Sequence, residues 1–162
     1  MSVSTAYVMS ADARARIDRE VRKYPPDQKQ SAVMAALAIA QDEQGWVSPD
    51  VIEAVAQVLG MPPIAVHEVA TFYNMYDLKP VGKNKITICT NLPCALSGGE
   101  KAAHYLKEKL GIDYRETTAD GQFTLVEGEC MGACGDSPVL LVNNKRMCSH
   151  MSNEKKIGRA HV

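Results

Sequence analysis

Four cysteines in two short loops constrain this chain more than any other feature of its sequence. Four residues separate Cys89 from Cys94, and three separate Cys130 from Cys134. Each pair follows a strand-like run. A thiol at the end of a strand is held in place with little entropic cost, and the loop beyond it can return the second thiol to the same point. Two such loops side by side would surround one small inorganic centre with sulfur.

Composition limits the partners that such a chain can have. The chain has 162 residues, which is long enough for one domain or two small ones. Its 18 basic and 19 acidic residues give a formal net charge of −1. This balance argues against nucleic acid or anionic lipid as the main partner. Residues 1–10 lack the apolar run of a signal peptide and no stretch is long enough to span a membrane, so we expect a soluble, intracellular protein.

The first half of the sequence has the apolar period of short helices. The predicted helices span residues 11–23, 27–44, 49–59 and 63–76. Ser48 and Pro49 provide a cap and a first-turn proline, and Gly60 provides a stop. The composition then changes at residues 80–84, which we interpret as a linker. We therefore predict an N-terminal helical bundle at residues 1–80 and a second domain at residues 81–162.

The second domain is predicted to mix strands with one helix. Strands are expected at residues 85–89, 114–117 and 122–126, with a hairpin over 138–147. Ser97 and Glu100 have the spacing of a capping box that would open a helix ending at Leu110. Asn143 and Asn144 tolerate the positive φ of a tight hairpin turn. The predicted class is α+β, with a mostly antiparallel or mixed sheet behind one helix.

Several kinds of site could use cysteine pairs. Free cysteines are common in cores, but two tight pairs after strands are unusual for that role. Thioredoxin-type exchange uses two residues between its thiols at a helix start, which neither pair has. Intracellular thiols stay reduced, so metal chemistry is favoured over structural disulfides. Structural zinc and a four-cysteine [2Fe–2S] cluster both remain compatible with these spacings.

The composition of the loops favours the cluster over zinc. Met131, Gly132 and Ala133 form a slim turn whose backbone N–H groups can approach inorganic sulfide. No lysine or arginine lies between the members of either pair. Glu127, Glu129 and Asp136 flank the second loop, where they would lower the potential of a cluster or simply be solvated.

Cys148 is interpreted as a spare thiol. The aromatic segment at residues 71–76 is either a core face, our preferred interpretation for Phe72, or a docking surface.

The two cysteine motifs resemble those of the thioredoxin-like [2Fe–2S] ferredoxin family. The motifs are CTNLPC at residues 89–94 and ECMGAC at 129–134. Within that family the chain is most similar to the small subunit of the flavoprotein arm of NADH:quinone oxidoreductase (respiratory complex I). The likeness runs from about Ala11 to Ser152 and includes QGWV at 44–47, ATFY at 70–73 and ETTADG at 116–121. Residues 155–162 depart from the family pattern, in which an apolar helix follows.

This resemblance implies a fold, a cofactor and a partner. The fold would be a thioredoxin-like α/β domain with a mixed four- to five-stranded sheet after the helical bundle. Cys89, Cys94, Cys130 and Cys134 would hold one [2Fe–2S] cluster for electron transfer, next to the FMN of a larger flavoprotein subunit that also binds NADH. The sequence itself has no Gly-rich dinucleotide fingerprint.

The same resemblance places the chain in an oxidoreductase, with no complete active site in this chain alone. The complex would lie peripherally on the cytoplasmic side of the inner membrane, without membrane insertion of this subunit. The alternatives are the equivalent subunit of an NAD-linked hydrogenase or formate dehydrogenase, and a structural-zinc interaction module.

Overall fold

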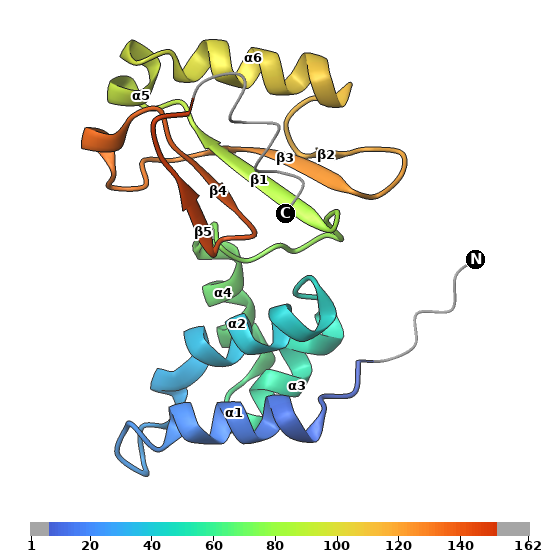
Figure 1. Cartoon of the computed structure of the whole chain (residues 1–162). Coiled ribbons are helices and arrows are strands. Elements are labelled where there is room, and N and C mark those ends of the chain that lie inside the picture. The colour runs from blue at the N-terminus through green and yellow to red at the C-terminus, as the bar shows by residue number, and fades with distance from the viewer. Residues whose placement is uncertain (1–6, 152–162) are drawn as a thin grey trace. The chain divides into compact units, whose positions relative to one another are not determined.

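The chain folds into two compact units, Met1–Pro80 and Val81–Val162, which are described separately. The structure is a computed structural model that describes residues 7–151 (Figure 1). The sequence departure at residues 155–162 therefore lies outside the described residues. Within residues 7–151, no helix is both long and apolar enough to cross a membrane.

The first unit consists of helices whose ends are set by local sequence. Its elements are α1 (Ala11–Val21), the 3-10 turn η1 (Lys29–Ala32), α2 (Val33–Gln44), α3 (Pro49–Leu59) and α4 (Pro63–Phe72). The Ser48 hydroxyl caps α3 by accepting a hydrogen bond from the Val51 N–H at 3.2 Å. Gly45 (φ 91°) and Gly60 (φ 67°) end α2 and α3 in the left-handed conformation that glycine adopts without strain. The caps predicted for α3 are confirmed.

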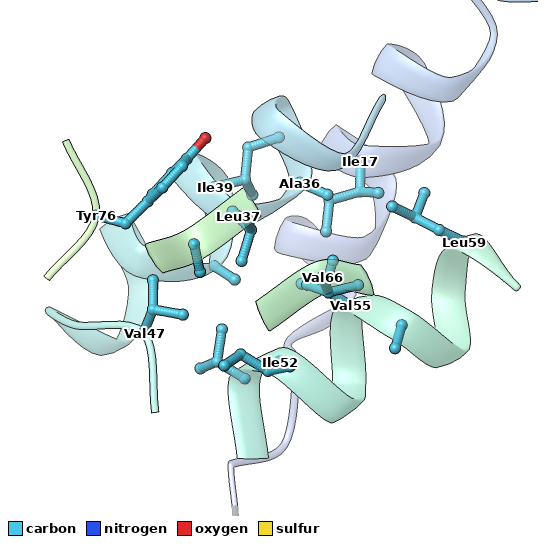
Figure 2. Close-up of a cluster of buried hydrophobic side chains, with 14 of the residues drawn as sticks. Ile17, Ala36, Leu37, Ile39, Val47, Ile52, Val55, Leu59, Val66 and Tyr76 are labelled. Carbon is cyan, nitrogen blue, oxygen red and sulfur yellow. The ribbon is translucent and has the colours of Figure 1, made fainter. Parts of the chain in front are cut away.

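The helices of the first unit share one apolar core (Figure 2). Ile17 of α1, Leu37 of α2 and Val55 of α3 are fully buried there. Tyr76, from the segment after α4, inserts its ring into the same core, and its hydroxyl donates to the Met34 carbonyl at 2.8 Å. Burial raises the pKa of Tyr76 to about 12.

Three predicted helix boundaries are wrong in this unit. The helix expected over residues 11–23 ends at Val21. The helix expected at residues 27–44 starts with η1 and becomes α-helical only at Val33. The helix expected to reach residue 76 ends at Phe72, because Gln41 of α2 holds the following chain in a turn. The Gln41 side-chain amide donates to the Met75 carbonyl at 3.0 Å and accepts from the Asp77 N–H at 2.7 Å. A contact between distant segments thus ends α4, and the sequence around Phe72 does not predict that contact.

Phe72 lies on the outside of the helical unit. Its side chain is 79% exposed and meets the Tyr73 ring edge-on, with ring centroids 5.0 Å apart. The core interpretation of Phe72 is therefore wrong. The buried positions of α4 are instead Val66 and Ala70, which lie one helical turn apart.

The second unit is built on a five-stranded mixed sheet in the order β2-β3-β1-β4-β5. Its elements are β1 (Asn84–Cys89), α5 (Leu92–Leu96), α6 (Gly99–Leu110), β2 (Glu116–Thr117), β3 (Phe123–Gly128), η2 (Cys134–Asp136), β4 (Leu140–Val142) and β5 (Arg146–Cys148). β1 runs parallel to β3 and antiparallel to β4, and β2 and β5 complete the edges in antiparallel pairing. The predicted α+β class and mixed sheet are confirmed.

Apolar side chains of the two central strands form the core under α6. Ile86, Ile88 and Leu125 of the sheet pack with Leu106 of the helix, and all four are buried. Cys148 of β5 is fully buried in this same cluster. The β4–β5 turn has positive φ at Asn143 (53°) and Asn144 (55°), as the hairpin prediction required.

The predicted capping box at Ser97 and Glu100 is wrong. Ser97 ends the short helix α5, and its N–H donates to the carbonyls of Pro93 and Cys94. α6 starts one residue later than the box requires, after Gly98 at φ 90°, and no side chain caps it. The short helix α5 carries Cys94, which interacts with Cys89, before α6 begins.

The core of the first unit provides a test of its packing. Leu37→Ala removes a fully buried side chain and should lower the free energy of unfolding by about 2–5 kcal/mol. Met34→Ala, on the same helix but 37% exposed, should change it by only about 0.5 kcal/mol. Urea unfolding of the full chain followed by circular dichroism measures both. Equal effects of the two substitutions would contradict this core.

Candidate metal centre

Parallel pairing brings the two cysteine loops to the same end of the sheet. In the β1–β3 ladder Cys89 lies opposite Gly128, two positions before Cys130. Both strands therefore run out at the same level, and both loops begin there. Figure 1 shows α5 and the orange loop after β3 at this shared end. Cys89, Cys94 and Val139 form a small buried cluster, with Met131 and Ala133 packed against it.

The first pair is buried. Cys89 is the last residue of β1 and is 1% exposed, and Cys94 lies inside α5 and is 2% exposed. Pro93 in the first turn suits a helix start because the missing N–H has no helical partner there. Gly99 lets α6 begin directly against this loop. A Cβ at position 99 would lie 2.7 Å from the Cys94 carbonyl oxygen and 2.9 Å from that of Cys89.

The second pair is exposed and adjacent. Cys130 and Cys134 both face outward, and their Sγ atoms are 3.8 Å apart. Two thiolates bound tetrahedrally to one metal ion at about 2.3 Å would have their sulfurs about 3.8 Å apart. Gly132 allows the tight return between them because it adopts φ 72°. The geometry of this pair thus fits two ligands of one metal ion.

Each buried thiol contacts the second loop. The Cys89 sulfur accepts hydrogen bonds from the backbone N–H groups of Asn91 and Met131. The Cys94 sulfur lies 3.6 Å from the Ser137 hydroxyl oxygen and near the Val139 N–H. In the thiol form Cys94 donates to Ser137, whose own hydrogen goes to the Cys134 carbonyl at 2.6 Å. In the thiolate form the same hydroxyl can turn to donate to Cys94.

These contacts shift the thiol pKa values in opposite directions. Burial raises the pKa of Cys89, and its interaction with Cys94 raises it further. Burial also acts to raise the pKa of Cys94, but donation from Ser137, Val139 and Cys89 outweighs it and lowers that pKa. The pKa of Cys134 is raised by its hydrogen bond to Cys130, by the charge of Cys130, and then by burial and Cys94. The thiols therefore interact as two pairs that are linked through Cys94 and Cys134.

The predicted site residues differ in how closely the structure brings them together. Cys89 contacts Cys94, and Cys130 contacts Cys134, but within residues 7–151 no group of three or more His, Cys, Asp or Glu side chains is arranged to hold a single metal ion. Cys148 lies apart from them, in the core under α6.

The three acidic residues flanking the second loop have polar partners. Glu127 accepts from Thr90, and Glu129 from Asn91. The Asp136 carboxylate lies 3.6 Å from His150 Nε2. The sequence indicates these carboxylates, but it predicts neither their partners nor the role of Ser137, because nothing local in the sequence marks those contacts.

The donor set suits a centre of two metal ions. Thiolate is a soft ligand that selects zinc, copper(I) and iron–sulfur clusters, whereas carboxylate-rich sites suit harder ions. A [2Fe–2S] cluster takes two protein ligands on each iron. Two separate pairs of thiols, one buried and one exposed, match that division.

The family of the chain follows from its sequence matches. Residues 17–158 match the family described as thioredoxin-like [2Fe-2S] ferredoxin. The chain belongs to the thioredoxin-like [2Fe–2S] ferredoxin family. This confirms the family expected from the cysteine motifs.

Relatives of this ferredoxin family member are subunits of NADH-quinone oxidoreductase. The E subunit of NADH-quinone oxidoreductase from Rickettsia bellii is 48% identical over 125 residues, which are 76% of this chain and 75% of that protein. NADH-quinone oxidoreductase subunit 2 from Thermus thermophilus is 39% identical over 134 residues, covering 83% of this chain and 74% of that protein. The predicted kinship with complex I subunits is therefore confirmed.

Solved structures give the same fold at lower identity. An NAD+-reducing [NiFe]-hydrogenase in the H2-reduced state matches 77% of this chain with a TM-score of 0.66 and 17% sequence identity. This chain spans 21% of that hydrogenase chain. At this identity the likeness shows the fold alone. Together with the family match it confirms the predicted thioredoxin-like fold class of this ferredoxin.

Gly99 provides a test of the first loop. Gly99→Ala would push a methyl group into two backbone carbonyls, which cannot give way as a flexible side chain could. We expect it to lower the free energy of unfolding by about 1–3 kcal/mol and to reduce bound iron per chain. Gly135→Ala is the matched control, because a Cβ there meets nothing within 4 Å. Thermal unfolding and iron analysis measure the two effects, and a harmless Gly99→Ala would contradict the described packing.

Proposed function

We propose that this chain is an electron-transfer subunit of an NADH:quinone oxidoreductase, in which Cys89, Cys94, Cys130 and Cys134 hold one [2Fe–2S] cluster. The observation that carries the proposal is the pairing of these thiols at the shared end of two parallel strands. The ferredoxin family and the complex I relatives support it.

The surroundings of the first pair suit a negatively charged centre. When bound, a [2Fe–2S] cluster supplies one-electron redox chemistry. The Asn91 and Met131 N–H groups aim at the Cys89 sulfur, and the Val139 N–H aims at the Cys94 sulfur, towards which the Ser137 hydroxyl can turn once Cys94 is a thiolate. Such donors stabilise negative charge on ligating sulfur, so they favour the reduced state. Burial of these two residues excludes water from the inner side of the site.

The exposed pair offers the side on which a redox partner can approach. Cys130 and Cys134 face outward, so a cofactor of another subunit could come close to their sulfurs without moving any element of the sheet. We propose that this partner is the flavoprotein subunit that binds NADH and FMN, and that the cluster lies next to its FMN. The names of the relatives support such an assembly. As part of that complex, the chain would sit peripherally on the cytoplasmic side of the inner membrane.

Loss of single cysteines tests the ligand set. Cys130→Ala should abolish the reduced-state EPR signal and lower iron and acid-labile sulfide from about two of each per chain. Cys148→Ala should keep both at the wild-type level, because Cys148 is buried in the core under α6, away from both pairs. Metal and sulfide analysis of the purified full chain, with EPR after reduction, provides the measurement.

The same analysis separates the proposal from its alternatives. A colourless protein with one zinc per chain and no sulfide would establish a zinc-stabilised interaction module instead. If the cluster is present, affinity purification from cells should recover a flavin-containing subunit with this chain. Recovery of a hydrogenase or formate dehydrogenase with it would assign the chain to that assembly rather than to complex I.

A further inference from the structure

Two side-chain hydrogen bonds join the start of the first cysteine loop to the end of β3 and the residue after it. Thr90 Oγ1 donates to Glu127 Oε1 at 2.7 Å, and Asn91 Nδ2 donates to Glu129 Oε2 at 3.2 Å. The donors directly follow Cys89, and the acceptors lie within three residues before Cys130. An ionised carboxylate has no hydrogen to donate and can act only as an acceptor. Thr90 and Asn91 are therefore the donors of these two bonds.

These bonds lie where the backbone ladder of β1 and β3 stops, and they cross it diagonally. The last paired positions are Cys89 and Gly128. Glu127 is the ladder partner of Ile88, and Glu129 directly follows the last residue of β3. Each carboxylate reaches a residue that follows Cys89 in the first loop. The two bonds thus fix the first loop against the second at the level where both loops leave the sheet.

The position of Cys130 depends on such ties before it in the chain and on Met131 after it, whose N–H donates to the Cys89 sulfur. Cys130 is exposed and lies beyond β3, whereas Cys89 ends a central strand and is buried. A centre shared by the two loops needs their sulfurs at a fixed separation, and a loop held at one end alone would not provide it. Residues outside the ligand set that orient the ligands in this way change metal affinity strongly when they are removed.

We propose that Glu127 and Glu129, through Thr90 and Asn91, are positioning residues that hold the second cysteine loop in register with the first. The proposal rests on the proposed function, since the cluster is what the register serves. It assigns the carboxylates a role beyond solvation: a hydrogen bond to a charged acceptor is stronger than one between neutral groups. The acids also place negative charge beside the site, which lowers the potential of a cluster.

The register and charge effects can be separated by substitution. Thr90→Val keeps the shape of the side chain and the charge of Glu127 but removes the donor. Glu127→Gln keeps an acceptor oxygen and removes the charge. Glu100→Gln is a matched control, because Glu100 lines the same hollow of about 400 Å³ as Thr90 and Glu127 but belongs to α6.

The experiment follows the release of iron from the reconstituted full chain to an excess of iron chelator. Thr90→Val should release iron about tenfold faster than the wild type, and Asn91→Ala should act in the same direction. Thr90→Ser should restore the wild-type rate, because serine keeps the hydroxyl. Glu127→Gln should raise the reduction potential of the cluster, because it removes a negative charge, and should release iron more slowly than Thr90→Val. Glu100→Gln should leave the release rate unchanged. Thermal unfolding of the iron-free proteins checks that Thr90→Val and Asn91→Ala still fold.

The outcomes distinguish this inference from the proposed function. A wild-type chain that takes up no iron and sulfide contradicts the proposed function itself. If the wild type holds a cluster, and Thr90→Val and Asn91→Ala both release iron at its rate with unchanged EPR g-values, the positioning role is overturned. If Thr90→Val does not fold, Asn91→Ala alone decides in the same way.

Discussion

The parallel pairing of β1 with β3 is the constraint on which the rest of the second unit depends. Parallel neighbours present their carboxyl ends at the same edge, so the loops that follow them must meet there. Six residue pairs, from Asn84 with Phe123 to Cys89 with Gly128, fix that level. A shift of one residue would turn every side chain of a strand to the opposite face and expose Ile86 and Ile88. The apolar core under α6 therefore fixes the register of β1 with β3, and this register fixes the positions at which the two cysteine loops begin.

The site has an inner and an outer half with different surroundings. The inner half, Cys89 and Cys94, is buried and receives hydrogen bonds from the second loop. The outer half, Cys130 and Cys134, is exposed and follows Glu127 and Glu129, which accept hydrogen bonds from the first loop. This division suits the proposed electron-transfer role, in which the protein would shield a centre from water on one side and leave it close to a partner on the other. The Rickettsia and Thermus relatives are named as subunits of NADH-quinone oxidoreductase.

Most local features were predictable from the sequence, whereas long-range contacts and the start of α6, where the expected capping box at Ser97 is absent, were not. The cap at Ser48, the stop at Gly60 and the turn at Asn143 depend on residues within a few positions, and all are confirmed. The cysteine spacings and their preceding strands likewise indicated the site, because the strand pattern is local. The end of α4 and the exposure of Phe72 depend on where Gln41 and the bundle core lie, which sequence spacing does not reveal. The hydrogen bonds of Glu127 and Glu129 were not predicted for the same reason, because their partners are 37 and 38 residues away in the sequence.

The most direct test of the central claim is X-ray absorption at the metal edges of the purified full chain. The account predicts iron, not zinc, surrounded by sulfur alone, with a second iron as a neighbouring scatterer in the same centre. Substituting any one of the four paired cysteines should remove that iron neighbour. Zinc in a four-sulfur shell, or iron with nitrogen or oxygen ligands and no second metal nearby, would contradict the account.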